Sequence, residues 1–230
     1  MGCRCGEIAA FSPGDSKASS AGASPTQGFT MSYSIIGSGS VGVALARQFA
    51  RSAIPVGIAN TRGPQSIASV ATELGDQVVP MTLQEALGAE VILLAVPFRA
   101  HRDVAKAAES WAGKVVIDAT NAYGVPPAEL DQLPSSTVVA KALPGAHLVK
   151  AFNHLPAAVL AQDPAGPGGR RVIFLSGDDD GANHQVAALV ERLGFAPVAL
   201  GKLAEGGRLV QARDKTWGPL IFQDLFKKAT

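Results

Sequence analysis

Short apolar runs alternate with amphipathic segments along most of the chain. The clearest run, Val91–Val96, is continuously apolar, which is typical of a strand buried on both faces of a parallel sheet. Apolar residues that recur on one helical face predict helices between such runs, as over Val41–Ser52. Strands are predicted over residues 33–36, 54–60, 77–79, 91–96, 115–118, 148–152, 172–175 and 198–200, and helices over 41–52, 66–74, 83–87, 100–111, 138–143, 155–162 and 182–193. This alternation predicts an α/β fold with a Rossmann-type, doubly wound, mostly parallel sheet.

Two ends of the chain depart from this pattern. Residues 1–30 are rich in Ser, Gly and Ala without apolar periodicity, which predicts a disordered tail. Its Cys3 and Cys5 have no second cysteine pair to complete a metal site. Residues 31–202 are expected to form the main domain, and 203–230 a small helical part with a break near Gly218–Pro219.

One stretch joins a strand to a helix through three glycines. Gly37, Gly39 and Gly42 follow the apolar strand and open the helical segment, the order that dinucleotide-binding turns require. The first glycine permits the tight turn, the second lets the backbone approach a pyrophosphate, and the third lets the helix pack closely. Helix N–H groups then face the phosphates. The turn residues are Gly37, Ser38, Gly39, Ser40, Val41 and Gly42.

Charge at the end of the second strand indicates which dinucleotide binds. An NAD-specific site usually has Asp or Glu there to bind the ribose 2′-hydroxyl, but this chain has Asn60, Thr61 and Arg62. An arginine can bind a 2′-phosphate through two hydrogen bonds, and Thr61 and Ser66 can add hydroxyls. We therefore predict NADP(H) as the cofactor. The alternative is an exposed arginine in an ordinary turn.

Two later loops are expected near the nicotinamide. Val96 and Pro97 follow the fourth strand, and Asn121 follows the fifth. Ligands of open parallel sheets bind outside these carboxyl ends. For Val96 and Pro97, simple termination of the strand is the alternative.

The overall totals exclude some classes of function. The net charge of +1 argues against binding of nucleic acid or membrane surfaces through bulk charge. No apolar run approaches the roughly 20 residues of a membrane-spanning helix. With both cysteines in the tail, a cytoplasmic protein is expected.

Several blocks of sequence resemble one family. Besides the glycine turn and Asn60–Arg62, they are Ala95–Pro97, Ile117–Asn121, Val149–Asn153 and Ser176–Asp179. In this order they are similar to the NADP-dependent reductases of the deazaflavin coenzyme F-420 and to the cytosolic reductase domain of six-transmembrane metalloreductases. The resemblance runs from about Met31 to Leu225.

The resemblance implies a hydride transfer between NADPH and a deazaflavin or flavin-like acceptor. It assigns the pyrophosphate to the glycine turn, the 2′-phosphate to Thr61 and Arg62, and the nicotinamide end to Val96, Pro97 and Ala151. The C-terminal segment 203–230 would complete the acceptor cleft. Archaeal members are expected to have a His-Thr pair where this chain has Asn153 and His154, which leaves the acceptor open.

Few side chains suggest acid–base chemistry, and hydride transfer needs little beyond orientation and exclusion of water. His154 follows a strand at the ligand-binding edge and is the candidate catalytic residue; a loop histidine bonded to backbone is the alternative. Lys150, on an apolar strand, is expected to pair with a phosphate or carboxylate, or to extend to the strand end. Asp178–Asp180 precede a helix, so capping is favoured over a metal site, and no metal ligands are assigned.

Other functions remain open on the sequence. A β-hydroxyacid or imine reductase shares the glycine strand but generally adds a large helical domain. An NADP(H)-binding redox sensor would bind without turnover and expose an apolar patch for a partner. Three interpretations are open for one group of apolar residues near the C-terminus: such a patch, a dimer contact, or the core-facing side of the last helix. The residues are Trp217, Leu220, Ile221, Leu225 and Phe226. A homodimer is not settled by the sequence.

Overall fold

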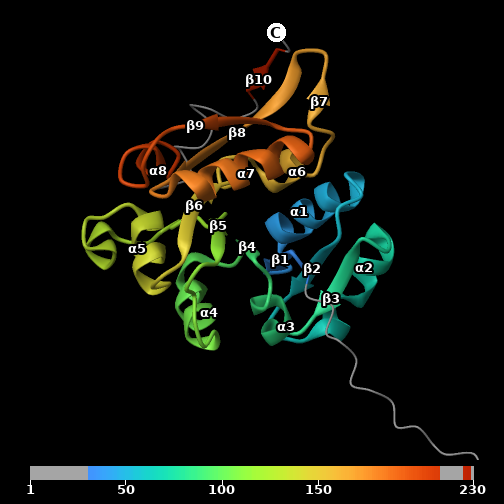
Figure 1. Ribbon diagram of the computed structural model, residues 1–230, viewed down its shortest axis with the longest axis horizontal. Coiled ribbons are helices and arrows are strands. Elements are labelled where there is room, and N and C mark those ends of the chain that lie inside the picture. Colours follow the sequence, from blue (N-terminus) through green and yellow to red (C-terminus); the bar gives the residue numbers. More distant parts are fainter. Residues whose placement is uncertain (1–30, 213–224, 229–230) are drawn as a thin grey trace, which may run out of the picture.

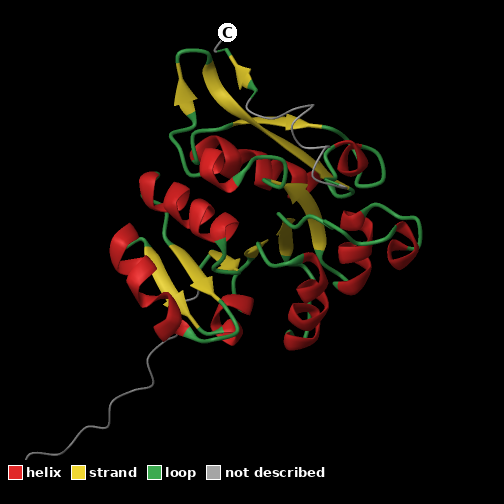
Figure 2. Cartoon of the chain, turned by 180° about the vertical axis from the view of Figure 1, so that it is seen from behind, coloured by secondary structure: helices red, strands yellow, loops and turns green. Residues whose placement is uncertain are grey.

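The computed structural model describes residues 31–212 and 225–228 of the 230-residue chain. In these residues ten strands join in one sheet, with helices on both faces (Figures 1 and 2). The core of the sheet is six parallel strands in the order β3-β2-β1-β4-β5-β6. These are β1 (Tyr33–Ile36), β2 (Val56–Ala59), β3 (Val78–Met81), β4 (Val91–Leu94), β5 (Val115–Asp118) and β6 (His147–Ala151). The Rossmann-type, mostly parallel sheet is therefore confirmed.

Successive residues of the central strands face opposite layers of helices. Ile35 and Leu93 point to one layer, and their neighbours Ile36 and Leu94 point to the other. All residues of β4 are buried, which explains its continuous apolar sequence, and β5 is equally buried although it ends in Asp118. The first layer consists of α1 (Ser40–Arg51), α2 (Ala68–Leu74), α6 (Ala157–Leu160) and α7 (Asp180–Arg192); the second consists of α3 (Leu83–Leu87), α4 (His101–Ala107) and α5 (Ser135–Ala142).

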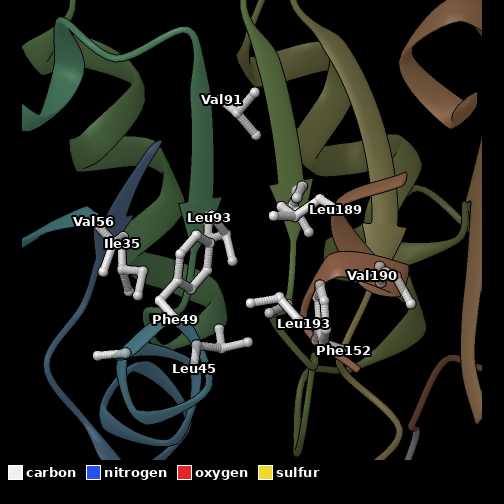
Figure 3. Packing of buried hydrophobic residues seen from close by; sticks show 14 of the residues in the cluster. Ile35, Leu45, Phe49, Val56, Val91, Leu93, Phe152, Leu189, Val190 and Leu193 are labelled. Atoms are coloured by element: carbon white, nitrogen blue, oxygen red, sulfur yellow. The ribbon is translucent and has the colours of Figure 1, made fainter. Parts of the chain in front are cut away.

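The first layer joins the two halves of the fold. Phe49 of α1 and Leu193 at the end of α7 belong to one buried cluster, together with Phe152 just after β6 (Figure 3). The rings of Phe152 and Phe195 lie 6.2 Å apart, edge to face. The sheet and both helices are thereby fixed against each other.

In the described ranges, three short one-turn 3₁₀ helices precede or connect the main helices. They are Pro64–Ile67, Phe98–Ala100 and Pro127–Leu130. The first two extend the predicted helices after β2 and β4. The third lies between residues 118 and 138, where the sequence predicts neither helix nor strand.

The second half is built around a long strand, β8 (Gly169–Gly177), which runs antiparallel to β6. Its other neighbours are β7 (Ala165–Gly166), β9 (Ala196–Ala199) and β10 (Phe226–Lys227). Residues 165–170 thus form a hairpin in a stretch for which the sequence predicts neither helix nor strand. In the predicted helical part 203–230, the described residues form one short helix, α8 (Gly206–Leu209), whereas Phe226–Lys227 form a strand on β8, so the helix predicted there is wrong.

Two predictions concern residues outside the described part of the chain. They are the disordered tail with Cys3 and Cys5, and the apolar patch as far as it includes Trp217, Leu220 and Ile221. Of the helices that the structure describes, none has the length and apolar character to cross a membrane.

Candidate cofactor site

The glycine turn lies where β1 meets β4 and α1. Gly37 has a φ of +118°, and a Cβ there would overlap the carbonyl of Ala95 at the end of β4. A Cβ on Gly42 would overlap the carbonyl oxygen of Gly37. In contrast, a Cβ on Gly39 would have no heavy atom within 4 Å. Gly37 and Gly42 therefore permit the close packing of β1, β4 and α1, whereas Gly39 leaves open space beside the turn that a ligand can occupy.

The N-terminus of α1 faces this open space without a cap. Gly39 is the N-cap residue, no side chain bonds the first N–H groups, and the first turn, which includes Ser40 and Val41, carries no acidic residue. Unpaired N–H groups together with the positive end of the helix dipole favour a bound anion.

Asn60 joins the glycine turn to the loop after β2. Its Nδ2 donates to Ser38 Oγ at 2.7 Å and to Ser66 Oγ at 3.0 Å. Its Oδ1 accepts from the backbone N–H of Arg62 at 2.8 Å. Because one amide bonds both loops, the two walls of the site are held in fixed relation.

A cavity of about 440 Å³ opens between these loops and α4. Arg62 lines this cavity, and its guanidinium makes no hydrogen bond or ion pair with any residue that the structure describes. An exposed cation without a partner there leaves its donors available to a ligand. Of the predicted site residues, those that line the cavity are Gly37, Ser38, Gly39, Asn60, Thr61, Arg62, Val96 and Pro97.

Three segments meet at the carboxyl ends of β5 and β6. Asn121 Nδ2 donates to the carbonyl of Asn153 at 2.8 Å, and Asn153 Nδ2 donates to Asn121 Oδ1 at 3.0 Å. Asn153 Nδ2 also donates to the carbonyl of Val210, just after α8, at 2.7 Å. This Asn121–Asn153 pair therefore links the sheet edge to the C-terminal segment.

A buried ion pair holds the loop that carries Asn121. Lys150 Nζ donates to Asp118 Oδ2 at 3.0 Å, and both side chains are fully buried. Lys150 Nζ also donates to the carbonyl of Thr120, while Asp118 Oδ1 accepts from the Thr120 N–H and hydroxyl. The prediction that Lys150 pairs with a carboxylate is confirmed.

His154 lies inside the fold, against β8. Only 4% of it is exposed, its Nε2 lies 3.2 Å from the Val172 carbonyl, and its ring packs on Phe174. Burial lowers the pKa of His154 to about 4, and the bond to the Val172 carbonyl opposes that shift. The imidazole is thus neutral near pH 7, with Nε2 as the donor to Val172. It does not line the cavity.

The acidic run before α7 serves the helix. Asp179 is the N-cap residue and accepts from the N–H of Ala182 at 2.7 Å, while Asp178 accepts from the N–H of Leu203. The predicted capping is confirmed.

Comparison with known proteins gives the relatives of this chain. The family model described as "NADP oxidoreductase coenzyme F420-dependent" matches residues 32–122. A crystal structure of a hypothetical protein from Sinorhizobium meliloti is 46% identical, with a TM-score of 0.79 over 86% of this chain and 96% of that chain. A putative F420-dependent NADP reductase from Arthrobacter sp. FB24 is 26% identical, with a TM-score of 0.64 over 78% and 90% of the two chains.

The chain belongs to this family of F-420-dependent NADP oxidoreductases. The metalloreductase STEAP3 of Rattus norvegicus is 31% identical over 177 residues, or 74% of this chain. This chain spans only about a third of that relative's length, 34%. A reductive aminase from Aspergillus terreus in complex with NADPH, 20% identical with a TM-score of 0.56 over 76% of this chain and 56% of that one, shares the fold.

The family assignment makes NADP(H) the cofactor. The residues at the cavity of this protein fit the phosphate groups of NADP(H). The uncapped α1 with open space at Gly39 suits a pyrophosphate, and the unpaired Arg62 suits a further phosphate. No acidic residue occupies Asn60–Arg62 at the end of β2. Asp103 is the one carboxylate among the residues that line the cavity, and it comes from α4 on the second helix layer.

Not every predicted site residue of this protein lines the cavity. Ser66 bonds Asn60, which lines the cavity. Asn121 bonds Asn153, and neither of these two residues lines the cavity. Ala151 is fully buried in β6. The roles predicted for Ala151 and His154 stay predictions.

Sequence reasoning missed the Asn121–Asn153 pair. Asn153 ends one of the sequence blocks that resemble the family, Val149–Asn153. It directly follows Phe152, whose φ of +61° turns the chain after β6 and so directs Asn153 toward Asn121. A positive φ is unusual for a bulky residue and carries no sequence signal of its own.

The buried His154 makes stability depend on pH. Its pKa is lower in the folded protein than the usual 6.5, so the unfolded chain binds more protons between about pH 4 and 6.5. The stabilisation is complete above that window and is lost as pH falls through it, by on the order of 3 kcal/mol. Denaturant unfolding at pH 7 and pH 5 measures the part of this loss that falls above pH 5, about 2 kcal/mol. His154→Gln should reduce it, whereas the exposed His184→Gln should not; an equal loss in both variants would refute it.

Proposed function

We propose that this protein transfers hydride between NADPH and a deazaflavin or flavin-like acceptor. The observation that carries the proposal is that Arg62, whose guanidinium has no partner among the described residues, lines one cavity together with Val96 and Pro97. That arrangement suits a cofactor bound along the edge of the sheet, with its 2′-phosphate on Arg62 and its nicotinamide toward β5 and β6.

Each part of the site has a binding role in this proposal. The turn from Gly37 to Gly42 binds the pyrophosphate with N–H groups of α1, and Thr61, Arg62 and Ser66 bind the 2′-phosphate. Val96, Pro97, Asn121 and Ala151 border the nicotinamide and keep water from it. The bound nicotinamide supplies the hydride, so the protein's task is to orient the two rings.

The acceptor is proposed from the relatives. The matching family model and the Arthrobacter relative are both described by the coenzyme F420, and the resemblance in later sequence blocks points the same way. The alternative as an imine reductase has less support, because those structures share the fold at 20% identity and the chain covers 56% of their length.

The proposed organisation follows the same division as the site. Residues 31–202 form the NADP-binding domain, and the segment from 203 completes the acceptor cleft. The bond from Asn153 to the carbonyl of Val210 supports this, because it joins that segment to the nicotinamide edge.

Hydride exchange by the full chain tests the proposal. Purified protein is mixed with NADPH and oxidised coenzyme F-420, with free flavins as other acceptors and NADH as the other donor. NADPH-dependent reduction of the deazaflavin is the expected result. Tight NADPH binding without reduction of any acceptor would contradict the proposal and favour a redox sensor.

Arg62→Ala should weaken binding of NADPH and leave that of NADH unchanged. A charge-assisted hydrogen bond contributes about 1.5–3 kcal/mol, so the NADPH dissociation constant should rise about ten- to a hundredfold. Titration calorimetry with both cofactors measures the two constants.

Arg102→Ala on α4 is the matched control, since Arg102 is also exposed but does not line the cavity. Equal weakening of both cofactors by Arg62→Ala would exclude a role in recognition of the 2′-phosphate.

A further inference from the structure

One face of α4 forms a wall of the cofactor cavity, the space of about 440 Å³ that Arg62 also lines. Ala100, directly before α4, and Asp103 and Val104 within it line this wall, and their spacing of three and four residues puts them on the same side of the helix. Leu83, the first residue of α3, lines the same cavity. Both helices belong to the second layer (Figure 1). Among these apolar side chains, the carboxylate of Asp103 is the exception.

The carboxylate of Asp103 has no partner within the described ranges, residues 31–212 and 225–228. It is exposed and makes no hydrogen bond or ion pair with a residue of these ranges. Arg62 lines the same cavity, and the two charged groups do not pair with each other. A carboxylate in a cavity that receives phosphate groups repels them. It therefore lowers the affinity for the cofactor unless the cofactor also offers it a hydrogen-bond donor.

The covalent structure of NADP(H) places such a donor near Arg62. The 2′-phosphate and the adenine are attached to neighbouring carbons of one ribose, so a phosphate bound by Arg62 brings the base into the same part of the cavity. Leu83, Ala100 and Val104 offer apolar surface to the flat ring of the base. The 6-amino group at the edge of the ring donates hydrogen bonds, and an ionised carboxylate only accepts them.

Stabilisation of α4 is the other explanation for an acid at this position. Asp103 lies in the first turn of α4, where a negative charge interacts favourably with the helix dipole. That interaction depends on the helix and not on the ligand. Because it contributes equally whichever base the dinucleotide carries, selectivity between bases is the measurement that separates the two explanations.

We propose that Asp103 binds the 6-amino group of the adenine of NADP(H) and selects adenine over bases that have a carbonyl oxygen at that position. This rests on the proposed function, through the binding of the 2′-phosphate by Arg62, and does not depend on the identity of the hydride acceptor. In hypoxanthine a carbonyl oxygen replaces the amino group, so two acceptors face each other and the carboxylate loses its bond. Asp103 determines cofactor specificity and takes no part in the hydride transfer.

Two dinucleotides that differ only at this position test the role of Asp103. NADP⁺ and its deamino analogue, which carries hypoxanthine in place of adenine, are titrated calorimetrically into the full chain with no acceptor present. The wild type should bind NADP⁺ about tenfold more tightly than the analogue, because one charge-assisted hydrogen bond is lost with the amino group. Asp103→Ala should weaken binding of NADP⁺ without weakening that of the analogue, so that the preference disappears.

Asp103→Asn keeps the size of the side chain and removes its charge. The amide oxygen can accept from adenine and the amide nitrogen can donate to the carbonyl of hypoxanthine, so this variant should bind both dinucleotides with similar affinity. Asp76→Asn is the matched control, since Asp76 is exposed between α2 and β3 and does not line the cavity. It should keep the wild-type preference. Denaturant unfolding of the three variants without ligand measures what each carboxylate contributes to stability.

A fragment of the cofactor shows which part of it Asp103 contacts. Adenosine 2′,5′-bisphosphate contains the base and the 2′-phosphate but lacks the nicotinamide, whose carboxamide also has N–H donors. Its affinity should fall about tenfold in Asp103→Ala. An unchanged affinity overturns the proposal, as does equal binding of NADP⁺ and its deamino analogue by the wild type. If the preference depends on Asp103 but NADPH reduces no acceptor, the adenine contact stands and the proposed hydride transfer fails.

Discussion

Gly42→Ala should strongly destabilise the protein, whereas Gly39→Ala should leave its stability nearly unchanged and impair NADPH binding. The two glycines belong to the same turn, so the contrast depends on what each new methyl group meets. At Gly42 it would overlap the Gly37 carbonyl oxygen, and Gly37 is itself held against the Ala95 carbonyl. No flexible side chain is available to move aside.

The cost at Gly42 is therefore a displacement of α1 from the sheet. Overpacking typically costs about 1–3 kcal/mol and occasionally more, and a backbone collision belongs at the upper end. At Gly39 the backbone has a φ of −76°, which alanine adopts freely, and only the weaker preference for alanine at an N-cap costs up to about 1 kcal/mol.

Denaturant unfolding and NADPH titration of both variants measure this contrast. Gly39→Ala should raise the NADPH dissociation constant about ten- to a hundredfold, because the methyl group occupies the space of the pyrophosphate and removes charge-assisted N–H contacts. Wild-type affinity in Gly39→Ala would show that the cofactor does not approach this turn. Wild-type stability in Gly42→Ala would show that α1 has room to shift.

The sheet could be predicted because its signals are local. The strand β4 is buried on both faces and so is continuously apolar, and the first three residues of β5 follow the same pattern. The helix α3 was predicted with its observed ends, and a capping box between Thr82 and Glu85 explains why its start is well defined.

The second half depended on contacts that no short segment encodes. The strand β10 has two residues and exists through pairing with Arg170 and Arg171 of β8. The sequence of so short a segment does not distinguish a helix from an edge strand, which is why a helix was predicted there.

The candidate site also combines features with a local sequence signal and features that depend on tertiary contacts. The glycine turn follows from a local order of strand, glycines and helix, and Arg62 from its distance along the chain. The Asn121–Asn153 bond joins residues 32 positions apart, and the burial of His154 depends on its packing against β8. These features are tertiary, so the sequence offered His154 as a catalytic candidate without a means to tell which way its ring points.

Lys150→Met should destabilise the protein by about 3–5 kcal/mol, because it leaves the carboxylate of Asp118 buried without its partner. Both side chains are fully buried. Methionine keeps most of the volume of lysine, so the loss comes from the charge rather than from a cavity. Lys141→Met, at an exposed position of α5, should change stability by no more than about 0.5 kcal/mol. A loss of stability of no more than about 0.5 kcal/mol in Lys150→Met would contradict the prediction.

The double variant Asp118→Asn with Lys150→Met separates charge from geometry. It removes both charges but keeps an oxygen that can accept from Thr120, so it should lose less stability than Lys150→Met alone. It still lacks the bond from Lys150 to the Thr120 carbonyl, which holds the residue before Asn121. NADPH binding and the rate of hydride transfer are measured on both variants alongside their unfolding.

A double variant that regains stability but not hydride transfer would show that the ion pair positions Asn121. Replacing a buried ion pair by uncharged groups is often neutral for stability, so stability alone gives little reason to keep these charges in the sheet. Their contacts give another: every one of them ends on Thr120 or within the pair. Full recovery of both properties would instead mean that the loop keeps its place without the charges, and that neutral residues serve this edge of the sheet equally well.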